Sequence, residues 1–94
     1  CGMAIFASQV PVIPQALEYA QMGLVPGGTH ANRNYCRHSV TADVGIPAYI
    51  MDILSDAQTS GGLLISVPSV RAQLLLEKLI EKVLKNSSLI GEVI

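Results

Sequence analysis

Apolar and polar positions along the chain follow two different spacings. Residues 2–7 and 63–67 are short, mostly apolar runs that end near proline, which is typical of buried strands. Residues 70–86 instead have apolar residues at helical spacing, namely Ala72, Leu75, Leu76, Leu79 and Val83. The pattern therefore predicts a central strand at 63–67 followed by a helix over 70–86, with Ser69 as its N-cap.

Three shorter helices are predicted from proline, glycine and threonine positions. Pro14 suits the first turn of a helix over 14–22 that a left-handed Gly23 ends. Thr29 is a good N-cap for a short helix through Tyr35. Apolar spacing predicts a third helix over 46–56, with Pro47 at an early helical position.

The order of these elements indicates the fold class. Residues 89–94 read as a last strand that Gly91 interrupts. We expect a single α/β (α+β) domain over residues 1–94, with helices packed on a small mixed sheet of about three or four strands. If the strands at 63–67 and 89–94 lie parallel, their connection is right-handed.

The high apolar and low charged content of the chain indicates that part of its surface packs against a partner. Half of its 94 residues are hydrophobic and 14% are charged, against about 25% charged in ordinary soluble domains, and the mean hydropathy is +0.45. The net charge of −1 and the aromatic content of 4% argue against nucleic acid as a partner. No apolar run is long enough for a membrane span, so we expect a cytoplasmic protein whose two cysteines, Cys1 and Cys36, are reduced.

Two glycine pairs are the main candidates for chemistry. Gly27 and Gly28 precede Thr29 at a predicted helix start, where backbone N–H groups and the helix dipole favour an anion such as phosphate. The second pair, residues 61–62, follows three hydrogen-bonding side chains: Gln58, Thr59 and Ser60. Neither pair matches a P-loop or a dinucleotide-binding motif. Ligand binding and simple turn formation both remain open interpretations.

Metal and nucleophile chemistry have little support in the sequence. Cys36 and His38 are close in sequence, but His30 is the only other histidine and a structural zinc site usually needs four ligands. Cys36 has no evident base to activate it as a nucleophile. The carboxylates are dispersed, with no pair spaced to hold magnesium. We therefore assign no catalytic residue and no metal ligand to this chain.

Two motifs resemble a known family. "GLVPGGTHANRNY" at residues 23–35 and "DAQTSGGLLISVP" at residues 56–68 are similar to the C-terminal domain of selenophosphate synthetase, also called selenide, water dikinase. The resemblance extends over nearly the whole chain, from residue 10 to the closing "IGEVI". Ala57 is a departure, because the family often has proline between the aspartate and the glutamine.

The resemblance implies part of an enzyme of the aminoimidazole ribonucleotide synthetase-like superfamily. The full-length enzyme would use ATP, Mg²⁺, selenide and water to make selenophosphate, AMP and phosphate. Its reactive residues would lie in an N-terminal ATP-binding domain that precedes this sequence, so this chain alone would be inactive and would bind no cofactor. The implied partners are that domain and a second copy of the full-length enzyme, as a homodimer.

The resemblance also gives the glycine motifs a role: they would line or shape the interdomain cleft through which phosphates pass. The residues concerned are Gly27, Gly28, Thr29, Gln58, Thr59 and Ser60. Two alternatives come from other classes of protein. The chain could be a stand-alone α/β module that binds a protein or a small ligand, or an isolated nucleotide-binding domain that uses the glycine loops directly.

Overall fold

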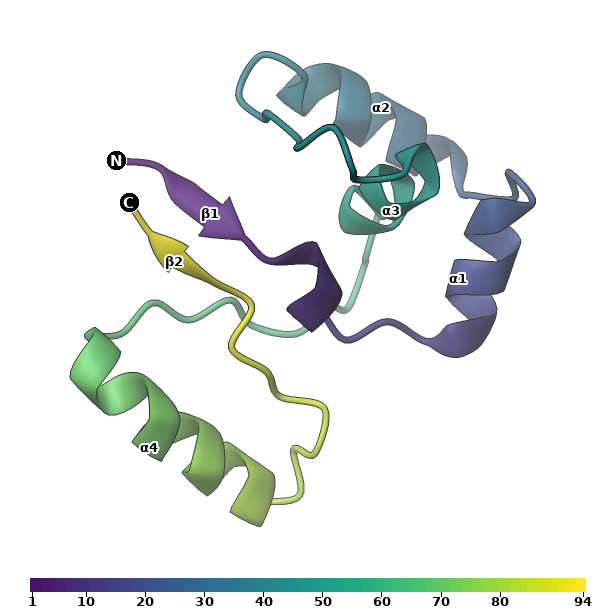
Figure 1. Cartoon of the computed structure of the whole chain (residues 1–94). Coiled ribbons are helices and arrows are strands. Elements are labelled where there is room, and N and C mark those ends of the chain that lie inside the picture. Colours follow the sequence, from purple (N-terminus) through teal and green to yellow (C-terminus); the bar gives the residue numbers. More distant parts are fainter. The chain divides into compact units, whose positions relative to one another are not determined.

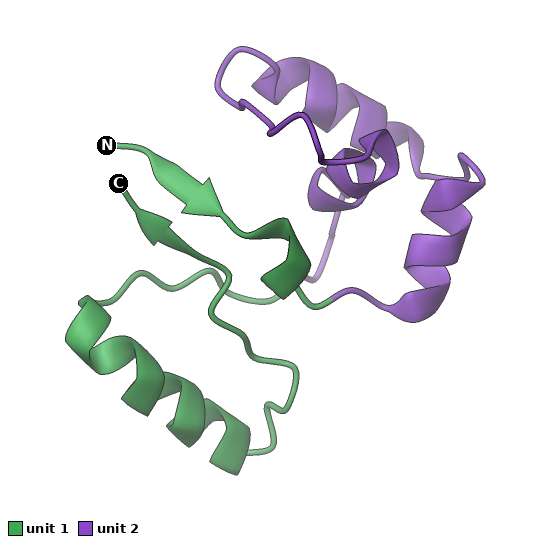
Figure 2. Cartoon of the chain, in the orientation of Figure 1, with its two compact units in different colours: residues 1–11, 62–94 green, residues 12–61 purple.

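The computed structural model describes all 94 residues and divides them into two compact units. Residues 1–11 and 62–94 form the first unit, and residues 12–61 form the second (Figure 2). The first unit contains both strands and the longest helix, whereas the second is entirely helical (Figure 1). The mixed α/β class is therefore confirmed.

The sheet of the first unit is a two-stranded antiparallel ribbon. β1 (Met3–Ile5) pairs with β2 (Gly91–Val93), and a short 3₁₀ helix, η1 (Ala7–Gln9), follows β1. Gly91 lies opposite Ile5, and a Cβ atom at Gly91 would collide with the carbonyl oxygen of Ala4. Glycine at this position therefore allows the two backbones to pair closely, and both predicted terminal strands are confirmed.

The predicted central strand at residues 63–67 is absent. This segment has no strand conformation and makes no backbone hydrogen bond, and Leu63, Leu64 and Ile65 are 88, 65 and 51% exposed. The sheet accordingly has two strands where three or four were expected. An aliphatic run favours a strand only where a neighbouring edge pairs with its backbone, and neither edge of the β1-β2 ribbon pairs with this segment. The condition for a parallel crossover is also unmet, because the first of its two strands is absent.

The predicted long helix is present as α4 (Ser69–Glu81), and its apolar stripe is the half-buried face. Pro68 occupies the N-cap position, so Ser69 is the first helical residue rather than the cap. The helix ends at Glu81, five residues before the predicted end. Val83 has a φ of +73°, and the N–H groups of Val83 and Leu84 donate to the carbonyls of Ile80 and Leu79, which closes the helix in a Schellman motif.

The second unit consists of three helices, α1 (Pro14–Gln21), α2 (Gly27–Cys36) and α3 (Ala48–Leu54), of which α1 and α2 both pack on α3. Pro14 is in the first turn of α1, and Gly23 ends it with a φ of +78°, as predicted. Pro47 is the N-cap of α3 and not a helical residue, so this helix begins at Ala48, two residues later than predicted. None of the helices of the chain combines the length and apolar composition required to cross a bilayer.

The start of α2 differs from the prediction. The helix begins at Gly27 with Pro26 as N-cap, so Thr29 is its third residue and not its cap. The carbonyl of Pro26 accepts a hydrogen bond from the Thr29 N–H at 3.0 Å, so the first turn of the helix forms three residues earlier than predicted. Glycine costs less here than in the middle of a helix, because Gly27 and Gly28 are the first two residues of α2.

Candidate functional site

The N-terminal turn of α2 lies against the segment that follows α3. A Cβ atom built at Gly28 would be 2.7 Å from the Cβ of Ala57, closer than real side chains approach each other. Gly28 is therefore required by packing, because any side chain there would push Ala57 away. The contact joins the two glycine-containing motifs, which are about thirty residues apart in the sequence, at one place in the second unit.

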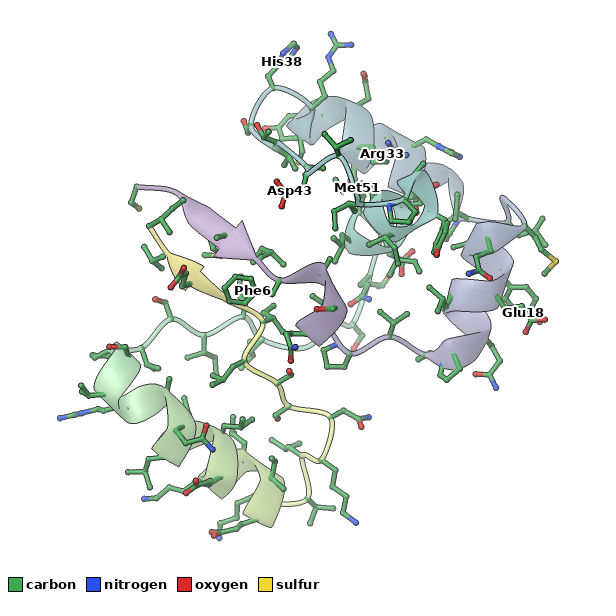
Figure 3. The ribbon with its side chains drawn as sticks, viewed as in Figure 1. Phe6, Glu18, Arg33, His38, Asp43 and Met51 are labelled. Atoms are coloured by element: carbon green, nitrogen blue, oxygen red, sulfur yellow. The ribbon has the colours of Figure 1, made fainter.

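Two polar interactions fix α2 beside α3 close to this contact. The Asn32 side-chain amide donates to the carbonyl of Ser55 at 3.0 Å. Arg33 Nη1 forms an ion pair with Asp52 Oδ1 at 2.6 Å, with the two side chains 40 and 15% exposed. Figure 3 shows Arg33 on the part of α2 that faces α3. Since Ser55 is two residues before Ala57, these interactions hold the segment in register with Gly28.

Sequence reasoning missed all three of these side chains. Asp52 was counted among dispersed carboxylates, and Asn32 and Arg33 were not singled out. The ion pair spans 19 residues and the hydrogen bond 23. Only the packing of α2 on α3 brings these residues together, and no local spacing rule predicts that packing.

Thr29 is completely buried beneath the first turn of α2. Its exposed fraction is 0%, and its Oγ1 atom has no hydrogen-bond partner. Because Thr29 is inside the helix, its hydroxyl does not cap the N-terminus, and burial also keeps it from an external ligand. Thr29 thus shapes the site by filling space behind the turn.

Gly27 is on the open side of the same turn. Nothing lies within 4 Å of a Cβ atom built there, and neither Gly27 nor Gly28 donates a backbone hydrogen bond. Two N–H groups at the positive end of a ten-residue helix are therefore without a backbone partner, and Gly27 is exposed whereas Gly28 is half-buried. The first turn has no acidic residue, whereas Arg33 is in the last turn. This arrangement can accept an anionic group through its backbone.

The other three predicted residues lie beyond Ala57 on an irregular, exposed segment. Gln58, Thr59 and Ser60 are all exposed and form no side-chain hydrogen bond. A Cβ atom at Gly61 would be 2.7 Å from Gln58 Oε1, which shows that the Gln58 side chain folds back over that glycine. The structure therefore attaches this segment to α2 through Ala57 and leaves its hydroxyl groups facing solvent.

The residues considered for metal binding are not gathered. Cys36 is the exposed last residue of α2, and His38 projects from the following loop, where its Nε2 accepts a hydrogen bond from Arg37 Nε at 2.9 Å (Figure 3). No three side chains of histidine, cysteine, aspartate or glutamate come together anywhere in the chain. The residues of this chain do not by themselves form a ligand set that fits Mg²⁺, which prefers six oxygen ligands.

Comparison with known proteins relates the whole chain to one group of enzymes. It is 40% identical over all 94 residues to a selenide, water dikinase of Pelobacter propionicus, and it covers 27% of that protein. It is 40% identical over 90 residues to the selenide, water dikinase of Clostridium botulinum strain Alaska E43, covering 96% of this chain and 26% of that protein. By sequence, the chain belongs to the selenide, water dikinase family. It spans about a quarter of the length of the curated relatives it matches.

A third selenide, water dikinase, from Clostridioides difficile, is 39% identical over 92 residues, which are 98% of this chain and 24% of that protein. No protein-family model matches the chain, and no solved structure does. The similarity to selenide, water dikinases includes both glycine motifs, because it extends over every residue of the chain.

Proposed function

We propose that this chain is the C-terminal domain of a selenide, water dikinase, the enzyme that converts ATP, selenide and water into selenophosphate, AMP and phosphate. The observation that carries the proposal is the 40% identity over all 94 residues. The full-length enzyme works in the cytoplasm with Mg²⁺. The chain alone has no catalytic residue and is inactive, because the reacting groups belong to the remainder of the enzyme.

The exposed apolar surface supports a covering domain. Ala20 is the only buried hydrophobic residue, whereas many large hydrophobic side chains are exposed, among them Ile13, Tyr19, Met22, Leu24, Leu63 and Val70. Soluble monomers rarely leave so many apolar side chains in water. The proposed partner is the N-terminal ATP-binding domain of the same enzyme, and the full-length enzyme is a homodimer.

The junction of α2 with Ala57 is the proposed contribution of this chain to the cleft. The unpaired N–H groups of Gly27 and Gly28 hold an oxygen of a phosphate group as it passes, and buried Thr29 keeps the turn in shape. The residues that follow Ala57 line the cleft on the same side as the start of α2, namely Gln58, Thr59 and Ser60. Nothing in this role uses the metal, since the chain lacks a fitting ligand set.

A chimeric enzyme tests the proposal. The corresponding 94 residues of the Pelobacter propionicus selenide, water dikinase are replaced by this chain, and formation of AMP and selenophosphate is followed with ATP in the presence and absence of selenide. We expect selenide-dependent turnover within about tenfold of the parent enzyme, because 40% identity preserves the packing of homologous domains.

The matched control is the same chimera with Gly28→Val, which displaces Ala57 and should lower kcat by more than tenfold. The 94-residue chain alone should give no product. A folded chimera that consumes ATP equally well without selenide would overturn the assignment of this domain.

A further inference from the structure

The segment that follows α3 is held by hydrogen bonds only where it begins. Asp56 donates the last backbone hydrogen bond, to the carbonyl of Ile53 at 3.1 Å, and no backbone hydrogen bond involves residues 57–67. The next one along the chain is accepted by Pro68, immediately before α4. The position of residues 58–60 beside α2 therefore depends on how firmly the end of α3 is fixed.

Asn32 is the side chain that fixes the end of α3. Ser55 is the C-cap residue of this helix, and its carbonyl is one of those that have no intrahelical partner at a helix C-terminus. Asn32 Nδ2 donates to that carbonyl at 3.0 Å, and no backbone N–H does so. A side chain of α2 thus caps α3 two residues before Ala57.

Asn32 is on the same face of α2 as Gly28. The two residues are four positions apart, which is slightly more than one helical turn. Gly28 contacts Ala57 and Asn32 contacts Ser55, so successive turns of α2 meet the chain in reverse order, as antiparallel packing requires. The hydrogen bond and the close contact act on the same stretch, residues 55–57, and the first therefore holds the second in place.

Other contacts keep the helices together if this hydrogen bond is lost. The ion pair of Arg33 with Asp52 joins α2 to the last turn of α3, and α1 also packs on α3. Asn32 is exposed, and one exposed hydrogen bond adds little to the net stability of a fold. Loss of the Asn32 amide should therefore change where the segment lies more than whether the unit folds.

We propose that Asn32 is a positioning residue of the full-length enzyme, whose amide holds the end of α3 so that residues 58–60 lie beside the N–H groups at the start of α2. The inference rests on the proposed function, in which both motifs line the cleft that phosphates pass. A misplacement of about 1 Å can cost roughly a hundredfold in rate, so loss of the amide donor should lower kcat. It should leave KM for ATP unchanged, because ATP is bound mainly by the remainder of the enzyme.

NMR spectroscopy of the 94-residue chain tests the positioning directly. Asn32→Asp keeps the size of the side chain but replaces the N–H donor with an oxygen that repels the carbonyl of Ser55. We expect the nuclear Overhauser effect between the α-protons of Gly28 and the methyl group of Ala57 to lose about half of its intensity or more, while the helical cross-peaks of α2 and α3 remain. Asn34→Asp is the matched control, because Asn34 is an exposed residue of α2 that forms no side-chain hydrogen bond, and it should retain the effect.

Steady-state kinetics of the chimeric enzyme measure what this position does for turnover. With selenide present, N32D should lower kcat by about tenfold or more and change KM for ATP by less than about twofold. N34D should leave both constants unchanged. Asn32→Gln keeps the amide donor on a longer side chain, and its kcat should stay within about threefold of that of the unmodified chimera.

Three results would overturn the proposal. An undiminished Overhauser effect in N32D would show that Asn32 does not hold Ala57, and a normal kcat despite a diminished effect would show that turnover does not depend on this position. An equal loss of kcat in N32Q would exclude the amide donor as the cause. A chimera without selenide-dependent turnover would instead contradict the proposed function, and the NMR result would still decide whether Asn32 holds the segment.

Discussion

Gly27 and Gly28 are neighbours in the sequence, but only Gly28 has no room for a side chain. Gly28→Ala should lower the free energy of unfolding by about 1–3 kcal/mol, as overpacking usually does. Gly27→Ala is the matched control and should leave stability unchanged or raise it by about 0.4–1 kcal/mol, because it meets open space and restricts the unfolded chain. Urea unfolding of both variants measures the difference.

The same contact predicts a specific rescue. In the double variant G28A/A57G, the methyl group moves from one side of the contact to the other, so most of the stability lost in G28A should return. If the two changes instead add their costs, the close approach of Gly28 and Ala57 is not the reason for the glycine.

Thr29 provides a second prediction at this scale. Its buried hydroxyl has no partner, and an unsatisfied buried hydroxyl costs about 1–3 kcal/mol. Thr29→Val keeps the shape and removes the hydroxyl, so urea unfolding should show a stability equal to or greater than that of the original chain. Thr29→Ala is the control for lost volume and should be destabilising. A destabilised Thr29→Val would show that the hydroxyl is hydrogen-bonded in solution.

Individual residues were the least predictable part of the site. The glycine pairs could be identified from the sequence, because two adjacent glycines indicate either a tight turn or a close contact with the backbone. The role of Thr29 was predicted wrongly as the N-cap of α2, a position that Pro26 occupies. Asn32, Arg33 and Asp52 have no local signature, since their partners are 19 and 23 residues away. Whether Gly27, Gly28 and Thr29 serve a phosphate stays a prediction that the chimeric enzyme can test.

At the scale of elements, α1 and α4 end in the same way with different residues. Each closes in a Schellman motif around a residue with positive φ, which is Gly23 in α1 and Val83 in α4. A β-branched residue in this conformation is strained by about 1–2 kcal/mol, whereas glycine is not. Val83 is 77% exposed and gains little from burial. The end of α4 is therefore a weak point of the first unit.

Exchanging the residue types tests this comparison. Val83→Gly should raise the midpoint of thermal unfolding, because the relieved strain of about 1–2 kcal/mol exceeds the entropic cost of one glycine. Gly23→Val should lower it by a comparable amount, since it introduces the same strain at the end of α1. Circular dichroism during heating measures both. A lower midpoint for Val83→Gly would contradict the assignment of strain to Val83.

Helices were predicted better than strands for a physical reason. A helix depends mainly on residues a few positions apart, such as the apolar stripe of α4 or the Pro14 and Gly23 at the two ends of α1. The local sequence therefore contains most of the information that specifies a helix. The end of α4 was placed five residues too late because the closing residue is valine, which gives no stop signal. Residues 63–67 have the composition of a strand, but a strand needs an edge to pair with, and composition does not specify one.

For the whole molecule, the sequence predicted the exposed apolar surface but not the division into two units. High mean hydropathy with few charges indicated a partner surface, and Ala20 is indeed the only buried hydrophobic residue. The division was missed although the chain crosses between the units at two places, near residues 11 and 62, that carry proline or Ser-Gly-Gly. Such short runs are as typical of turns within a domain as of linkers, so composition alone does not mark them as boundaries.

The last prediction concerns nucleotide binding by the whole chain. The feature proposed for phosphate is the helix end at Gly27 and Gly28, and such an end stabilises an anion by at most about 2 kcal/mol. A dissociation constant of 1 mM already requires about 4.1 kcal/mol. Calorimetry of the 94-residue chain with MgATP should therefore show no binding heat, whereas the chimeric selenide, water dikinase should bind MgATP. Submillimolar binding by the chain alone would mean that it is a nucleotide-binding domain in its own right, and would contradict its proposed role as a part of the enzyme that only completes the cleft.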